Sequence, residues 1–258
     1  MDTQFQDLRV MVTAGASGIG LAIAQAFAQA GARVQISDIS ASAIEAAVPS
    51  LPGGGGWIAD ASNPAAVDAW FGHALATLGG LDVLVNNAGI AGPTARIEEI
   101  EPQQWDETIA VNLRSQYLCV RRAIPALRTS HRASIINLSS VAGRLGYPLR
   151  TPYAASKWAV VGLTQSLALE LGGDDITVNA ILPGIVDSER SRNVTAAKAQ
   201  ARQISEADML TEILANVALH RKVQLADVAQ TALFLASSAG RSFTGQSLNV
   251  CAGIQSLR

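Results

Sequence analysis

Short runs rich in valine and isoleucine alternate with longer helical segments, and this alternation limits the fold more than any other feature of the chain. We predict strands at 8–13, 32–37, 57–60, 81–86, 134–138, 177–182 and 247–251. Helices are predicted at 19–30, 64–78, 103–128, 152–171 and 226–237. Strands that are apolar along their length belong in a parallel sheet covered on both faces by helices. The sequence therefore predicts an α/β fold, with a flexible loop at the glycine-rich residues 52–56.

Composition is consistent with one large domain over residues 1–258. The chain is 49% hydrophobic and 16% charged, so it can bury a sizeable core. A net charge of -2 without a basic block argues against a nucleic-acid partner. We find no bilayer-length apolar run and no signal peptide, and therefore expect no membrane partner and a cytoplasmic protein. Two cysteines and three scattered histidines predict neither a disulfide framework nor a metal site.

A glycine-containing turn joins the first predicted strand to the first predicted helix. Residues 13–20 read Thr-Ala-Gly-Ala-Ser-Gly-Ile-Gly. Such glycines let the backbone approach a pyrophosphate, whose charge the helix N-terminus stabilises. Asp38, at the end of the second strand, can accept hydrogen bonds from an adenosine ribose and would repel a 2′-phosphate. Because neither Ser17 nor Ile39 supplies a positive charge for that phosphate, we predict NAD rather than NADP.

Tyr153 and Lys157 are four residues apart in a predicted helix, and Ser140 follows a predicted strand. The helical spacing places both side chains on one face, where the ammonium favours the ionised phenol that acid/base chemistry needs. The end of a strand is where α/β folds place reactive groups. A tyrosine and a lysine at this spacing are common on exposed helices, so the pair alone is a weak indication.

Together, these features resemble the short-chain dehydrogenase/reductase family over nearly the whole chain. The ordered matches are the glycine turn, Asp60, Asn86-Asn87-Ala88-Gly89, Asn112, Ser140, the Tyr153/Lys157 pair and Pro183-Gly184. The resemblance implies a single NAD(P)-binding domain with a Rossmann-like, doubly wound sheet of about seven parallel strands. It also implies a homotetramer or homodimer, a small-molecule alcohol or ketone as substrate, and a substrate-covering segment at about 187–220.

The resemblance also implies a role for each matched residue. Tyr153 would be the general acid/base, and Lys157 would support its ionisation and hold the nicotinamide ribose. Ser140 would bind the substrate oxygen, and Asn112 would anchor a water in a proton relay. The residues implied to bind the cofactor are Gly15, Ser17, Gly18, Ile19, Gly20, Asp38, Asp60, Ala61, Asn87, Ala88, Gly89, Tyr153, Lys157, Pro183, Gly184, Val186 and Ser188.

Two short stretches depart from the family pattern. Ala14 stands where the family usually has glycine, and a left-handed backbone there would cost an alanine about 1 kcal/mol or more. Cys251-Ala252-Gly253 replaces a frequent aspartate-glycine-glycine near the last strand. We expect neither departure to prevent cofactor binding, and we do not expect Cys251 to be a nucleophile.

The substrate is the least determined feature. Arg144, Arg150, Arg190 and Arg192 lie in the two segments expected near the pocket and could bind a carboxylate, sulfonate or phosphate. Surface arginines are common, and these could instead face solvent or pair with Asp187 and Glu189. Apolar residues in the loop at 145–149 favour an apolar ketone about equally well.

Three functions remain open at this point. The first is an NAD-dependent dehydrogenase acting on a CH-OH group, with a polyol, sugar acid or hydroxy acid among the candidate substrates. The second is a 3-oxoacyl-thioester reductase, against which Asp38 counts because such biosynthetic reductions usually use NADPH. The third is a non-enzymatic nucleotide sensor or scaffold, which would not need an acid/base pair.

Overall fold

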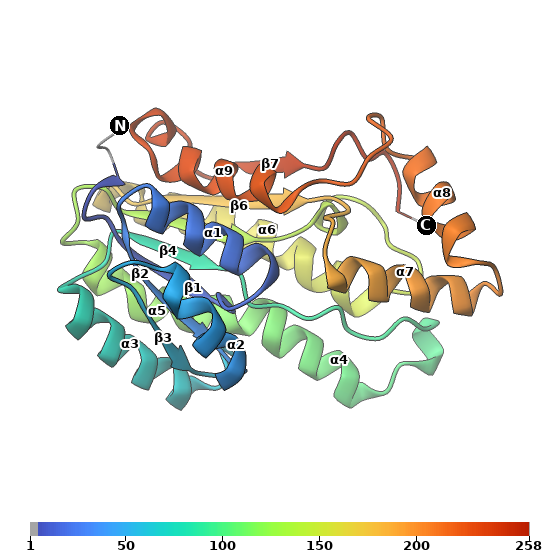
Figure 1. The fold of residues 1–258 in the computed structure, drawn as a ribbon, viewed down its shortest axis with the longest axis horizontal. Coiled ribbons are helices and arrows are strands. Elements are labelled where there is room, and N and C mark those ends of the chain that lie inside the picture. Colours follow the sequence, from blue (N-terminus) through green and yellow to red (C-terminus); the bar gives the residue numbers. More distant parts are fainter. Residues whose placement is uncertain (1–4, 258) are drawn as a thin grey trace.

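A single seven-stranded parallel sheet organises the computed structural model, which describes residues 5–257 apart from the side chain of Arg190 (Figure 1). All six neighbouring strand pairs are parallel. In sheet order the strands are β3 (Gly55–Ile58), β2 (Arg33–Asp38), β1 (Arg9–Thr13), β4 (Val83–Asn86), β5 (Ser134–Leu138), β6 (Thr177–Pro183) and β7 (Ser247–Val250). The winding direction reverses between β1 and β4, and ligands of such sheets bind at this reversal, beyond the carboxyl ends of the strands. The predicted doubly wound Rossmann-like fold is confirmed.

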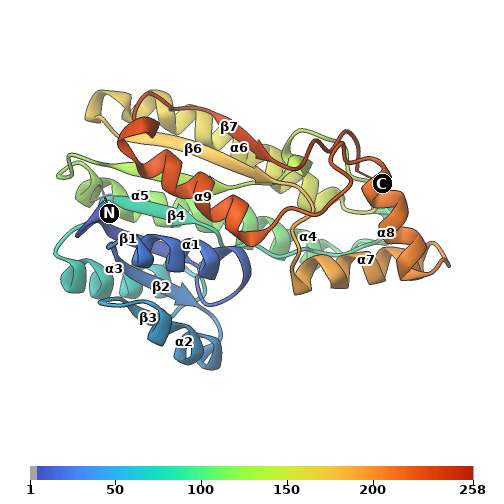
Figure 2. The same cartoon turned by 45° about the horizontal axis from the view of Figure 1, so that its top comes forward.

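Helices cover both faces of the sheet (Figures 1 and 2). One face carries α1 (Gly18–Gln29), α2 (Ala41–Ala47) and α9 (Leu225–Ala236). The other carries α3 (Pro64–Leu78), α5 (Ser115–Leu127) and α6 (Thr151–Leu171). Beyond the carboxyl ends of the central strands lie α4 (Pro102–Ile109), α7 (Glu189–Ala201) and α8 (Glu206–Ala215). In the described chain no helix is both long and apolar enough to cross a bilayer.

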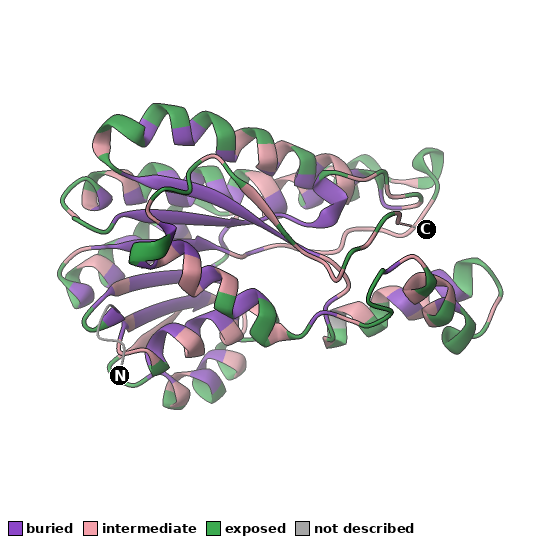
Figure 3. Ribbon diagram, turned by 90° about the horizontal axis from the view of Figure 1, so that it is seen from above, coloured by how far each residue is buried: buried purple, intermediate pink, exposed green. Residues whose placement is uncertain are grey.

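Apolar side chains fill the space on each side of the sheet, and Figure 3 shows the central strands buried along their length. Successive residues of a strand point to opposite faces. In β1, Val10 and Val12 therefore pack into the cluster beneath α1 and α9, whereas Met11 packs beneath α3 and α5. Each such fully buried side chain contributes about 1.5–3 kcal/mol relative to its exposed state. The sheet is thus a rigid base for the loops at its carboxyl edge.

The edge strand β3 begins two residues earlier than predicted. Gly55 and Gly56 pair with Gln35 and Ile36 of β2, so the prediction that both glycines belong to a flexible loop is wrong. A Cβ atom on Gly56 would lie 2.4 Å from Cγ2 of Ile44 in α2. The glycine is therefore required for helix packing and extends the strand.

The helix predicted at 103–128 is interrupted by one wider turn. Residues Ala110–Arg114 form the π-helical turn η4 between α4 and α5. Such turns hydrogen-bond to the fifth residue rather than the fourth and occur frequently at functional sites. Asn112 lies within η4 and is fully buried. Other one-turn helices, of the 3-10 type, are η2 (Val48–Ser50), η3 (Ile97–Glu99), η5 (Val141–Gly143), η6 (Gly172–Asp174) and η7 (Ser238–Gly240).

Candidate active site

The turn between β1 and α1 packs closely against the end of β4. The backbone of Ala14 is left-handed, with φ of 47°, which is the strained conformation considered from the sequence. The amide Nδ2 of Asn87 donates to the carbonyl oxygens of Thr13 and Ala14, at 3.1 and 3.0 Å. A Cβ atom on Gly20 would lie 2.2 Å from the Ala14 oxygen and 2.5 Å from Asn87 Nδ2. Only glycine therefore fits at position 20.

Thr13 is a positioning residue to which the sequence analysis assigned no role. Its Oγ1 accepts hydrogen bonds from the backbone N–H groups of Asn87 and Ala88, both at 2.9 Å. The threonine is buried at the end of β1. A hydroxyl at the end of an apolar strand was the only signal that could have identified it. It joins the β1 and β4 loops on the two sides of the winding reversal.

The N-terminus of α1 is suited to an anion. No side chain caps it, and its first turn contains no acidic residue that would compete with a phosphate. Asp38, at the end of β2, accepts from the N–H of Ala16 in the turn at 3.3 Å and from the N–H of Ser40 at 3.1 Å. These observations fit a dinucleotide whose pyrophosphate meets α1 and whose adenosine ribose meets Asp38.

The other residues expected on the adenosine side lie around the same edge of the sheet. Asp60 is exposed and accepts from the N–H and hydroxyl of Ser62, at 2.8 and 2.7 Å, while Ala61 is buried. A Cβ atom on Gly15 would lie 2.6 Å from Cγ2 of Ile36, so the turn packs directly on β2. The assigned adenosine contacts remain predictions.

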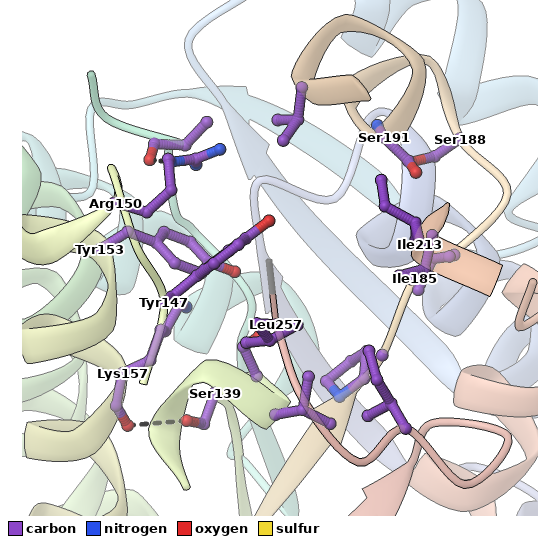
Figure 4. A pocket seen from close by; sticks show the side chains of 18 of the residues that line it. Ser139, Tyr147, Arg150, Tyr153, Lys157, Ile185, Ser188, Ser191, Ile213 and Leu257 are labelled. Carbon is purple, nitrogen blue, oxygen red and sulfur yellow. Dashed lines mark hydrogen bonds between the residues drawn. The ribbon is translucent and has the colours of Figure 1, made fainter. Parts of the chain in front are cut away.

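Ser140, Tyr153 and Lys157 line one cleft at the carboxyl ends of β5 and β6. Figure 4 shows Tyr153 and Lys157 in this cleft. Lys157 Nζ donates to the carbonyl of Leu138 at 2.9 Å and lies 5.7 Å from the centre of the Tyr153 ring. Ser140 Oγ accepts from the N–H of Ala142 at 3.1 Å, and its own proton can point into the cleft. The structure thus brings together the three side chains that the motifs separate by up to seventeen residues.

Asn112 lies behind this cleft and is not among the residues that line it. Its side chain accepts from the N–H of Ile90 at 2.7 Å and donates to the Ile90 carbonyl and the Ser156 hydroxyl, at 3.1 and 3.0 Å. A Cβ atom on Gly89 would lie 3.2 Å from Asn112 Oδ1 and 3.4 Å from Lys157 Nζ. The side chain of Asn112 therefore ties the β4 loop to α6, and the expected water relay stays a prediction.

The expected nicotinamide side lies opposite, where Pro183, Gly184, Val186 and Ser188 all line the cleft, as does Ile19 from the glycine turn. Ser188 also caps α7, because its hydroxyl accepts from the N–H of Ser191 at 3.2 Å. The departure from the family pattern at Cys251 affects how this residue packs against Gly184. A Cβ atom on Gly184 would lie 2.8 Å from Cys251 Cα, and Ala252 adopts a left-handed φ of 53°.

Of the four arginines predicted near the substrate, Arg150 lines the cleft. Arg144 is exposed, and it donates to the carbonyl of Ser247 at 3.1 Å. Arg192 is also exposed, and its Nη1 lies 3.7 Å from Oδ1 of Asp187. Neither of these two lines the cleft, which agrees with the alternative weighed for them from the sequence, and the side chain of Arg190 lies outside the described residues.

Several cleft residues were missed from the sequence. Lys198 of α7 is the most informative of these, because it is charged and buried. Tyr147, expected only as part of the apolar loop at 145–149, also lines the cleft and is partly buried. Ser191, Val194, Thr195 and Lys198 recur at helical spacing and share the α7 face toward the cleft, a pattern that the sequence did contain. The other cleft residues to which the sequence assigned no role are Ala91, Leu138, Ser139, Val141, Ile185, Ile213, Asn216, Ile254, Ser256 and Leu257.

Burial shifts the pKa values of three groups. It lowers the pKa of Lys198 to about 8, and the positive charges of Arg150 and Arg202 act in the same direction. Burial also raises the pKa of Tyr147. The pKa of Cys119 rises to about 12, so its thiol stays protonated and inert. Across residues 5–257, no three His, Cys, Asp or Glu side chains are grouped as metal ligands would be.

A Rossmann-like sheet, a glycine turn and a serine, tyrosine and lysine in one cleft define an oxidoreductase of nucleotide-dependent type. Residues 13–255 match a family described as enoyl-(acyl carrier protein) reductase. The chain belongs to the short-chain dehydrogenase/reductase family, as the motifs predicted.

Its relatives differ in substrate and cofactor. A 3-oxoacyl-(acyl-carrier-protein) reductase of Staphylococcus aureus is 36% identical over 252 residues, which cover 95% of this chain and 96% of the relative. A crystallised actinorhodin polyketide ketoreductase with NADPH is 30% identical with a TM-score of 0.91, covering 98% of both chains. NAD+-bound xylitol dehydrogenase, at 24% identity, shares the fold with a TM-score of 0.94, covering 97% of this chain and all of its own.

Proposed function

We propose that this protein is an NAD-dependent dehydrogenase that interconverts a secondary alcohol and its ketone. One observation carries the proposal: a single cleft is lined both by Ile19 and Asn87 of the nucleotide side and by Ser140, Tyr153 and Lys157. A nucleotide sensor would need the first group but not the second. A cleft that contains both groups favours an enzyme over a binding module.

The glycine turn, Asp38 and the cleft residues Pro183 to Ser188 would hold the dinucleotide. NAD(H), when bound there, accepts the hydride in oxidation and donates it in reduction. NAD is preferred in the proposal because the Asp38 carboxylate lies against the turn, where a 2′-phosphate would meet a like charge.

Side chains of the protein transfer the proton between the substrate and the enzyme. In oxidation, the alcohol O–H bond breaks and its proton passes to the phenolate oxygen of Tyr153, while the C–H bond breaks with its electron pair leaving as hydride. Lys157 Nζ, 5.7 Å from the ring centre, places a positive charge beside the tyrosine that exchanges the proton. Ser140 donates a hydrogen bond to the substrate oxygen, where negative charge develops. In reduction, Tyr153 returns the proton.

A direct test is absorbance at the NADH band with NAD+ and a panel of polyols, hydroxy acids and apolar secondary alcohols. Wild-type turnover that is lost in Tyr153→Phe supports the proposal. Tyr117→Phe is the matched control, because Tyr117 is exposed on α5, away from the cleft. Equal activity in the Tyr153→Phe variant would exclude the tyrosine as the acid/base.

Reduction of a 3-oxoacyl thioester is the second candidate, because one relative with 36% identity carries that activity in its name. The two candidates are separated by cofactor as well as substrate. Faster reduction of an acetoacetyl thioester with NADPH than any reaction with NAD+ or NADH would replace the first proposal with the second.

The segment at 187–220 is proposed to cover the substrate, since α7 and α8 both contribute side chains to the cleft. Assembly into a homotetramer or homodimer is proposed as well. On α6, Trp158 is 51% exposed and Leu169 is 87% exposed, and large apolar groups left in water commonly mark an interface. Light scattering after size-exclusion chromatography tests the assembly, which a monomer at micromolar concentration would contradict.

A further inference from the structure

Arg150 is buried in the cleft with part of its hydrogen-bonding capacity unused. Its side chain is among the most buried in the protein, with the residue only 2% exposed. Nη2 donates to the carbonyl of Ala91 at 2.5 Å, but Nε and Nη1 have no partner among the described residues. A buried guanidinium is usually paired with a carboxylate, because leaving its N–H groups unsatisfied costs free energy.

Lys198 brings a second cation to the same cleft. The residue is 3% exposed, and its Nζ lies 4.3 Å from the centre of the Tyr147 ring. No hydrogen bond or ion pair joins Nζ to any described residue. Arg150 and Arg202 are the charged groups that perturb it, and the nearby Glu212 carboxylate is already paired with Arg202. Within residues 5–257, two positive charges therefore lie in one cleft without a counter-charge.

The aromatic rings between these cations offset only part of the cost. Arg150 Cζ lies 5.4 Å from the centre of the Tyr147 ring and 5.3 Å from that of Tyr153 (Figure 4). Such contacts recover less free energy than the burial of an unpaired ion costs. If Arg150 served only to hold the Ala91 carbonyl, this role would explain the burial of Nη2 but not of Nε and Nη1. It would not explain why Lys198 is buried in the same cleft.

The positions of Arg150 and Lys198 relative to Tyr153 favour a role in binding over a structural one. Arg150 lies beside the ring of Tyr153, and Tyr147 contacts Arg150, Lys198 and Tyr153 together. Any anion held by the two cations is therefore close to the phenol that exchanges the proton.

We propose that the cleft selects an alcohol or ketone carrying a nearby carboxylate or comparable oxyanion, which Arg150 and Lys198 bind. This inference rests on the proposed dehydrogenase function and narrows its substrate to an acid. The same oxyanion chemistry is shared by hydroxy acids, sugar acids and hydroxyalkyl sulfonates. All three classes place a formal negative charge where the described lining of the cleft has none.

The test compares each acid with its uncharged primary amide, which has nearly the same size. Three pairs serve as probes: lactate and lactamide, 3-hydroxybutyrate and 3-hydroxybutyramide, and gluconate and gluconamide. Binding is measured by titration calorimetry with NADH present, so that no oxidation occurs, and kcat/KM is measured separately with NAD+. We expect at least one acid to exceed its amide by about tenfold to a hundredfold, the range for hydrogen bonds to charged groups.

Substitutions assign the effect to the two cations. Lys198→Met, which removes the charge at similar length, is expected to abolish most of the preference for the acid, and Lys198→Arg to retain it. Arg150→Lys tests the second cation, with circular dichroism to verify folding. Arg144→Met and Arg192→Met are matched controls, because both arginines lie in the same segments but outside the cleft lining.

Each outcome decides the matter. If every amide binds as tightly as its acid, or if Lys198→Met leaves the preference unchanged, the anion site is wrong even where turnover occurs. If an acid binds selectively to the wild type and not to Lys198→Met but no alcohol is oxidised, the anion site stands and the proposed dehydrogenase function fails. The calorimetric arm thus keeps the two proposals separable.

Discussion

Replacing Lys198 by methionine should stabilise the fold, although Lys198 is proposed to bind substrate. The pKa of Lys198 falls from 10.5 to about 8 because burial and neighbouring arginines disfavour the ammonium. At about 1.4 kcal/mol per pKa unit, the charged lysine destabilises the folded state by up to about 3.5 kcal/mol. Methionine fills a similar volume without a charge, so it removes this cost.

The pH dependence of the stability gained in Lys198→Met shows whether the charge of Lys198 is its cause. Below pH 8, folded and unfolded chains both carry the proton, and the folded wild type bears the full cost. Between pH 8 and 10.5 the folded state loses the proton while the unfolded state keeps it, so wild-type stability rises. The advantage of Lys198→Met should therefore be largest at neutral pH and small by pH 10.5.

Urea unfolding followed by tryptophan fluorescence measures the effect, at equal protein concentration because assembly shifts apparent stability. Lys222→Met is the matched control. Lys222 Nζ lies 3.3 Å from Asp187, so its loss should change stability by at most about 1 kcal/mol, in the destabilising direction. A Lys198→Met variant no more stable than the wild type at pH 7, or a gain that persists unchanged at high pH, would refute the reasoning.

Three further predictions concern the nucleotide side and the titration of the cleft. Ala14→Gly should stabilise the protein by about 1 kcal/mol, because φ of 47° strains alanine but not glycine; a lower midpoint in thermal unfolding would contradict this. Asp38→Ser should raise KM for NAD+ by about tenfold and improve NADP+ relative to NAD+ in steady-state assays, by removing an acceptor and a repelling charge. KM for an anionic substrate should rise above pH 8 as Lys198 loses its proton, and should remain flat to pH 10 in Lys198→Arg; identical profiles would remove Lys198 from the site.

The fold was accessible from the sequence because its central strands are buried on both faces. Val83–Asn86 and Thr177–Pro183 therefore read as nearly uninterrupted apolar runs. The pattern failed where packing overrides local preference. Gly56 belongs to an edge strand, and it is a glycine because Ile44 of α2 occupies the space that a Cβ atom would need. Composition alone assigned this glycine to a loop.

The nucleotide and catalytic residues could be located because each is in a motif at a strand end or at helical spacing. Lys198 could not be located in this way, because its contact with Tyr147 depends on how α7 packs along the cleft. Arg150 was named together with Arg144 and Arg192, and nothing in the sequence separates a buried arginine from two exposed ones. The difference is entirely one of tertiary packing.

The π-helical turn η4 constrains the number of residues between α4 and α5 more strongly than it constrains which residues they are. An α-helix rotates by about 100° per residue, and the wider turn accommodates one residue more than a regular helix would. Deleting one residue within Ala110–Arg114 would make α4 and α5 one regular helix, and would rotate one relative to the other by that angle. Either Asn112 would then leave Ile90 and Ser156, or the buried face of α5 would turn away from the sheet. A point substitution can be absorbed here more easily than a change of one residue in length.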